Sequence, residues 1–269
     1  MSSEQSGPGS DTNQKLGPLP PEEWPDVEHL VTEDDTPVDI FSSKQQRLLV
    51  EPLYTSWDGP GNGRRFLAMS NIGLFYGVNQ PPLVPDVMLS LDVCTPSDPW
   101  PKINRAYFLW MYAKPPDVVI EIVAEQADGE DSWKLATYAQ IGLPYYVIFD
   151  PEQLLSDQIL RVYGLHLGEY LPEPAHWLPR VQLGLALWSG RYEQIQFSWL
   201  RWCHQDGTVV STGAELVEQV RRRREQAELD YEQTRQRTAR AQAERQAAEE
   251  HRERLAARLR ELGIDPEEC

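Results

Sequence analysis

The chain has 269 residues, and 42 acidic residues against 25 lysines and arginines give it a formal net charge of −17 at pH 7. This balance argues against a tight, non-specific nucleic-acid binder, because such proteins carry a broad basic surface. No apolar run of about 18 residues predicts a membrane span, and the polar amino terminus does not resemble a signal peptide. The three scattered cysteines form no disulfide framework or metal-ligand spacing, so we expect a cytoplasmic protein without membrane association.

Residues 1–40 are rich in Ser, Pro, Gly, Asp and Glu and show no helical or strand periodicity. Such a segment has little apolar surface to offset the entropy lost on ordering, so we predict a disordered acidic tail. Trp24, Val27 and Leu30 are the residues that could dock on a folded domain. A solvated tail is the favoured interpretation.

We expect a globular domain over residues 41–206. Apolar residues from 48 to 57 indicate a short helix, which Pro52 either limits or restarts. Two apolar runs at 66–69 and 74–78, separated by Asn-Ile-Gly, predict a β-hairpin.

An aromatic stretch at 107–112 predicts an edge strand. Aromatic side chains near a nucleic-acid site can stack on bases, but this pattern is more typical of core packing. Three further β-rich segments, at 159–163, 183–188 and 195–202, are expected to complete or cover the sheet.

The central stretch predicts an α/β arrangement. Residues 85–91, 117–123 and 145–150 are apolar runs of strand length and rich in β-branched residues. Residues 131–140 have apolar side chains at helical spacing and are followed by glycine and proline, which end helices. The order is therefore strand, strand, helix, strand.

Two of these strands carry a carboxylate where an apolar residue is expected. Alternation places Glu121 on the same face as Val119 and Val123, and an unpaired ionised carboxylate there would cost several kcal/mol. Asp86 lies at the start of the preceding strand. Two converging carboxylates suit a divalent cation, and Lys134 on the helix could stabilise a developing anion. Structural salt bridges are the alternative explanation.

The same stretch resembles the Uma-two family of restriction-endonuclease-like proteins, within the PD-(D/E)XK nuclease superfamily. The resemblance covers most of residues 41–200. The matching residues are Pro85-Asp86, Pro116 to Val123, Lys134-Leu135, Tyr138-Ala139, Gly142-Leu143-Pro144, Tyr146 and Asp150-Pro151.

The resemblance implies a restriction-endonuclease-like core, with a mixed central β-sheet flanked by helices, and hydrolysis of DNA phosphodiester bonds. It further implies that Mg²⁺ or Mn²⁺ is held by Asp86, Glu121 and the backbone carbonyl of Ile122. The superfamily's usual lysine position holds Val123 here. The resemblance therefore transfers the lysine's catalytic role to Lys134.

One departure from the family pattern leaves a second functional interpretation open. The family usually follows its Glu strand with a Ser-Pro-Ser-Thr-like turn, whereas this chain has Ala124–Ala127. The alternative is a catalytically silent protein that keeps the fold and acts as an assembly module. Where DNA is the substrate, contacts must be local, and the basic residues available are Arg64, Arg65, Lys102, Arg105 and Lys114.

The last part of the chain changes composition. A turn-rich linker is expected over 207–214, followed by one long helix over 215–263 without proline. Its apolar residues recur with a seven-residue repeat, which is typical of a coiled coil, although arginine, threonine and alanine weaken the middle of the seam. We therefore predict a homo-oligomer formed through this helix. The alternatives are a helix packed on its own domain and a solvated, partly frayed helix. The four arginines Arg221–Arg224 could contact DNA phosphates, but a run of this kind is more often a solvated helical turn whose charges are interleaved with nearby glutamates.

Overall fold

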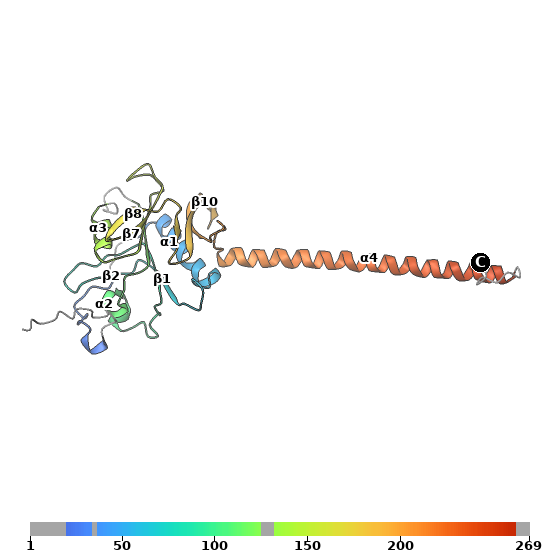
Figure 1. Cartoon of the computed structure of the whole chain (residues 1–269), viewed down its shortest axis with the longest axis horizontal. Coiled ribbons are helices and arrows are strands. Elements are labelled where there is room, and N and C mark those ends of the chain that lie inside the picture. Colours follow the sequence, from blue (N-terminus) through green and yellow to red (C-terminus); the bar gives the residue numbers. More distant parts are fainter. Residues whose placement is uncertain (1–19, 34–36, 125–131, 262–269) are drawn as a thin grey trace, which may run out of the picture. The chain divides into compact units, whose positions relative to one another are not determined.

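The computed structural model describes residues 20–33, 37–124 and 132–261 (Figure 1). The chain divides into two units, Met1–Gly213 and Ala214–Cys269. The first holds all of the strands within the described residues and carries the candidate site, whereas the second is a single helix over its described part.

The first unit is built on a six-stranded mixed sheet. In spatial order its strands are β1 (Phe66–Ser70), β3 (Val87–Leu91), β5 (Val118–Ile122), β6 (Tyr145–Phe149), β7 (Leu160–His166) and β8 (Glu169–Pro172). Only β5 and β6 pair in parallel; the other neighbours are antiparallel. A parallel pair needs a crossover connection, and α3 (Trp133–Gln140) supplies it. The predicted order of strand, strand, helix and strand is confirmed.

Both faces of this sheet are buried, because side chains alternate along each strand. On one face, Ile120 and its neighbours pack against Leu49 and Leu53 of α1 (Ile40–Ser56). On the other face, Val119 packs in a cluster that includes Tyr138 of α3. The expected mixed sheet flanked by helices is therefore present.

A second sheet covers the far side of α1. It contains β9 (Trp177–Leu178), β10 (Leu183–Tyr192) and β11 (Ile195–Cys203), in the order β11-β10-β9. The buried Gln45 amide of α1 exchanges two hydrogen bonds with the Leu200 backbone, and the Trp202 indole donates to the Leu49 carbonyl. These bonds fix α1 between the two sheets, which matters for the site described below.

Helix α1 is longer than the sequence suggested. It begins at the Asp39 cap, whose Oδ1 accepts the backbone N–H groups of Phe41 and Ser42 at 2.7 and 3.0 Å. It then passes through Pro52 without ending. Proline removes one backbone hydrogen bond, but Pro52 is buried beside Leu53, and this packing offsets the loss.

The predicted hairpin at 66–78 is wrong. β1 pairs with β3, whereas β2 (Leu74–Phe75) pairs in parallel with β4 (Tyr107–Phe108). The predicted edge strand at 107–112 is correct only for β4, because the helix α2 (Leu109–Tyr112) follows β4 directly. The short 3₁₀ helix η2 (Lys102–Asn104) precedes β4. With these distant partners, Leu74, Phe75, Tyr107 and Phe108 are all buried.

The amino-terminal segment departs from the predicted disordered tail. After the 3₁₀ helix η1 (Pro21–Glu23), Val27 and Leu30 are buried, with 7 and 9% of their surface exposed, against Phe75, Ala106 and Phe108. Residues 1–19 and 34–36 lie outside the described part of the chain. Segment 20–33, called the arm below, is thus docked on the domain.

The predicted linker also begins too early. Val210 and Thr212 are buried, and the Val210 carbonyl accepts a hydrogen bond from the Arg201 guanidinium at 2.7 Å. The first unit therefore extends to Gly213.

The carboxyl-terminal helix, α4 (Gly213–Glu261), has 49 residues and confirms the predicted long helix. None of its residues is buried, and Val217, Val220, Leu229, Tyr231 and Leu255 are exposed apolar side chains. Ion pairs spaced three or four residues apart run along its surface. Neither α4 nor any other described helix is long and apolar enough to span a membrane.

Candidate functional site

The sheet register places the two candidate carboxylates side by side. β3 and β5 run antiparallel with Val87 opposite Ile120, so continuing the register by one residue sets Asp86 opposite Glu121 on the same face. The Asp86 Oδ2 atom accepts the backbone N–H of Ile122 at 2.7 Å. The Asp86 side chain thus continues the hydrogen-bonded ladder between β3 and β5 beyond Val87, where backbone pairing of these two strands ends.

Glu121 is buried and engages α3 through both of its oxygens. Its side chain is 2% exposed; Oε1 accepts the Tyr138 hydroxyl at 2.8 Å and Oε2 accepts Lys134 Nζ at 3.1 Å. Burial raises the pKa of Glu121 to about 8, and the nearby Asp86 charge acts in the same direction. The Lys134 charge and the two hydrogen bonds lower this pKa but do not cancel the effect of burial.

Helix α3 delivers both partners of Glu121 from one face. Lys134 and Tyr138 are four residues apart, which places them on the same side of a helix. The superfamily's usual lysine position, two residues after Glu121, holds Val123, which is buried in the cluster around Tyr138. Residues two apart on a strand share a face, so Val123 faces the same side as Glu121. Lys134 reaches this carboxylate from the following helix instead.

A residue that the sequence did not single out completes the arrangement. Gln46 of α1 is buried, and its Nε2 donates to Asp86 Oδ1 at 2.7 Å and to Asn71 Oδ1 at 3.0 Å. The Asn71 amide donates back to Gln46 Oε1 at 2.9 Å. Gln46 lies three and seven residues before the buried Leu49 and Leu53, so a polar residue at helical spacing from core leucines was the available signal.

The acid pair opens into a cleft of about 370 Å³. Glu121, Asp86, Lys134 and Ile122 line one side of it. The Ile122 carbonyl points toward the same edge of β5 as its N–H, which bonds Asp86, because both groups of a strand residue project in one direction. The cleft is also lined by Val31, Thr32, Pro37, Val38 and Asp39. The segment that precedes α1 is therefore a wall of the cleft.

The donor set fits a hard divalent cation. Two carboxylates and one carbonyl offer only oxygen ligands, as Mg²⁺ and Ca²⁺ prefer. The described residues contain no cluster of three or more His, Cys, Asp or Glu side chains, so water would complete the coordination. Burial is the main cause of the raised pKa of Glu121, and the Asp86 charge adds to it, so a cation bound between the two acids would favour the ionised carboxylate.

The basic residues proposed to contact DNA already have partners within the chain. Arg64 forms a bidentate pair with Asp92, and Lys114 pairs with the buried Asp117. Lys102 and Arg105 bond to the arm, and Arg65 to Cys94. A DNA strand would have to displace these partners or bind elsewhere.

A mixed sheet with an acid pair on adjacent strands and a lysine on the crossover helix defines a restriction-endonuclease-like, nuclease-type fold. Residues 31–190, more than half of the chain, match the Uma2 family, described as "Putative restriction endonuclease". The chain belongs to this family. No curated protein and no solved structure matches it. Gln46, Asp86, Glu121 and Lys134 all lie within the matched range.

Proposed function

We propose that this protein is a metal-dependent endonuclease that hydrolyses DNA phosphodiester bonds. The observation that carries the proposal is the convergence of Asp86, Glu121 and Lys134 on one edge of an open cleft. Structural ion pairs do not require a cleft. Membership of a family described as restriction endonucleases supports DNA as the substrate and a divalent cation as the cofactor.

Asp86, Glu121 and the Ile122 carbonyl would hold Mg²⁺ or Mn²⁺. When bound, such a cation supplies Lewis-acid stabilisation of the phosphate and lowers the pKa of a bound water. Lys134, next to Glu121, would stabilise negative charge on the non-bridging phosphate oxygens. Water contributes its oxygen to phosphorus as one P–O bond breaks, leaving a phosphomonoester and a free hydroxyl.

Two further residues position the acids. Gln46 donates to Asp86 Oδ1 and Tyr138 to Glu121 Oε1, so each carboxylate is held in one orientation before any ligand arrives. Both partners are buried, and loss of either donor would leave its carboxylate to be held through the other oxygen, by the Ile122 N–H or by Lys134. Their substitution should weaken cation binding more than it changes the fold.

The test combines calorimetric titration with Mg²⁺ or Mn²⁺ and cleavage of supercoiled plasmid. Asp86→Asn and Glu121→Gln should abolish both cation binding and cleavage, while Asp157→Asn, an exposed residue outside the cleft, should leave them unchanged. Cleavage that persists in both site variants would contradict this assignment. Absence of cation binding by the unsubstituted protein would contradict it as well.

We also propose that α4 associates with a second copy of the chain. The supporting observation is a helix of 49 residues that leaves Val217, Val220 and Leu255 exposed near its two ends. This arrangement also suits the alternative function, an assembly module without catalysis. The altered turn that raised this alternative begins at Ala124, which lines the cleft, whereas the rest of the turn lies outside the described residues.

A further inference from the structure

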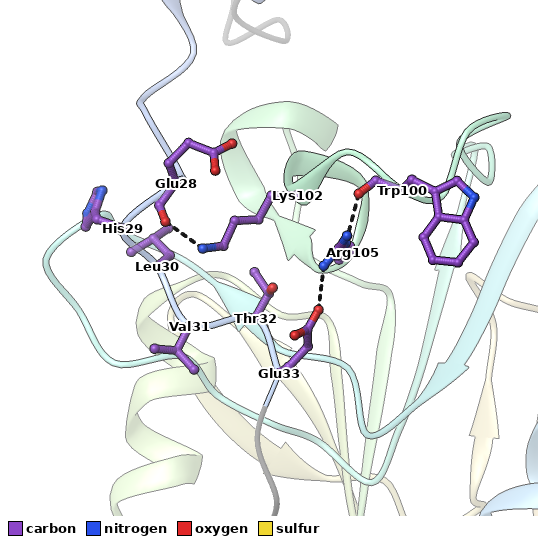
Figure 2. Close-up of a pocket in the computed structure, with 9 residues that line it drawn as sticks. All are labelled: Glu28, His29, Leu30, Val31, Thr32, Glu33, Trp100, Lys102 and Arg105. Atoms are coloured by element: carbon purple, nitrogen blue, oxygen red, sulfur yellow. Dashed lines mark hydrogen bonds and ion pairs between the residues drawn. The ribbon is translucent and has the colours of Figure 1, made fainter.

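The acidic arm contacts two basic residues of the neighbouring surface, Lys102 and Arg105. Residues 20–33 include five acidic side chains and no lysine or arginine. Lys102 Nζ donates to the Glu28 carbonyl at 2.6 Å, and Arg105 donates to Glu33 Oε1, also at 2.6 Å (Figure 2). The Arg105 Nε–H is directed at the Trp100 carbonyl, which fixes the guanidinium in place.

These contacts border an open surface pocket of about 620 Å³, lined by the arm and by Trp100, Lys102 and Arg105 (Figure 2). Lys102 and Arg105 both point at the arm, and the Trp100 side chain is largely exposed, with 76% of its surface accessible. In Figure 2 the Trp100 ring extends from the side of Arg105 opposite the arm. Two cations can bind phosphates, and an exposed aromatic ring next to them along the chain can stack on a base. The Glu33 carboxylate occupies the position at which Arg105 would bind a phosphate.

The same arm also borders the acid-pair cleft. Val31 and Thr32 line both cavities, so the basic surface and the cleft of Asp86 and Glu121 share one wall. A nucleic-acid strand that reached the acid pair from this side would pass over Lys102 and Arg105. It would compete with the arm for these two residues.

The arm is held by two apolar anchors. Val27 and Leu30 are buried against Phe75, Ala106 and Phe108. The ion pair between the arm and the domain, Glu33 with Arg105, lies at the surface. Glu33 and Arg105 are 74 and 38% exposed, so their ion pair is weak and screened by salt. A polyanion with several phosphates can displace such a contact.

We propose that Trp100, Lys102 and Arg105 form a DNA-binding subsite that the acidic arm occupies in competition with the DNA backbone. This inference rests on the proposed function, because it supplies the contact surface for the substrate of the same cleft. It explains how a chain with a net charge of −17 can bind DNA locally: the basic residues are paired with the arm until DNA displaces it.

The test measures binding of a fluorescein-labelled DNA duplex by anisotropy in EDTA, so that neither cation binding nor cleavage contributes. Glu33→Gln frees Arg105 and should tighten binding several-fold, with a log K against log salt slope steeper by about 0.9, as expected for one added phosphate contact. Val27→Ser with Leu30→Ser releases the arm, so binding should tighten by about tenfold and the slope should steepen by about 1.8. Arg105→Gln in that background should reverse about half of the slope change.

Glu23→Gln is the matched control, because it removes the same charge from the arm outside the cavity. An equal effect of Glu23→Gln and Glu33→Gln would reduce the result to net charge and overturn the subsite. Unchanged affinity and slope in Glu33→Gln would overturn it too, and this variant keeps both apolar anchors, so misfolding would not explain the result. If the arm effect is present but cation binding is absent, the proposed hydrolysis fails while the subsite stands as a DNA-binding surface. The reverse outcome removes the subsite alone.

Discussion

Replacing Glu121 by glutamine should stabilise the protein near pH 8 and remove the part of the pH dependence of its stability that this residue contributes. Burial raises the pKa of Glu121 from 4.5 in the unfolded chain to about 8 in the folded protein. The folded state therefore holds this proton more tightly than the unfolded state does. The contribution of Glu121 to the free energy of unfolding is fully present below pH 4.5. It decreases as the pH rises toward 8, by up to about 5 kcal/mol.

Glutamine keeps the shape of Glu121 and removes its charge. Its side-chain oxygen can still accept one of the two hydrogen bonds made to Glu121, from Tyr138 or from Lys134. Lys134 loses its carboxylate partner, but its side chain is 16% exposed, so water can solvate the ammonium at a cost of about 1–2 kcal/mol. The net expectation at pH 8 is a gain of about 2 kcal/mol or more, and little difference at pH 5.

The measurement is urea unfolding of the unsubstituted protein, Glu121→Gln and the exposed control Glu152→Gln at pH 5, 6.5 and 8, in EDTA. A structural role for the Lys134–Glu121 ion pair makes the opposite prediction, a loss of about 3–5 kcal/mol in Glu121→Gln at pH 8. That loss, together with unfolding of the parent that does not depend on pH, would refute the account of a strained acid pair. Added Mn²⁺ should raise the melting temperature of the parent and not of Glu121→Gln.

Three more substitutions or truncations test other parts of the account. Lys134→Met should abolish DNA cleavage while leaving cation binding measurable by calorimetry, and equal loss of both would assign Lys134 to the cation site instead. Tyr138→Phe removes a buried donor to a carboxylate, so it should cost about 1–3 kcal/mol in urea unfolding and lower cation affinity, and an unchanged affinity would limit its role to packing. A chain ending at Gly213 should form a smaller oligomer than the full chain by light scattering, and an equal stoichiometry would exclude α4 as the main contact.

Much of the central fold follows from local sequence. The strands at 85–91, 117–123 and 145–150 and the helix between the last two are indicated by apolar runs and helical spacing, which depend on neighbours a few residues away. The long helix α4 is likewise set by its composition and by the absence of proline. Glu121 was recognisable as a special residue because a carboxylate in an apolar strand is costly wherever that strand packs.

The partners of these elements depend on contacts between distant residues. The run at 66–70 looked like half of a hairpin, yet it pairs with β3, because pairing there buries both faces of the sheet. Gln46 gave only a weak signal, and its bond to Asp86 exists because two sheets hold α1 in place. The disordered tail was predicted from the average composition of residues 1–40. Docking of the arm depends instead on two residues, Val27 and Leu30, which pack against the aromatic side chains of Phe75 and Phe108.

The sequence by itself determined that the chain contains a mixed α/β domain followed by a long helix, since hydrophobic periodicity and helix propensity act locally. With the family resemblance, it also named Asp86, Glu121 and Lys134. Only the tertiary structure decided that Asp86 and Glu121 stand opposite each other, because a pair of residues 35 positions apart meets through strand register. It also decided that the acidic arm covers Lys102 and Arg105, because weak surface ion pairs form only once apolar anchors hold the segment in place.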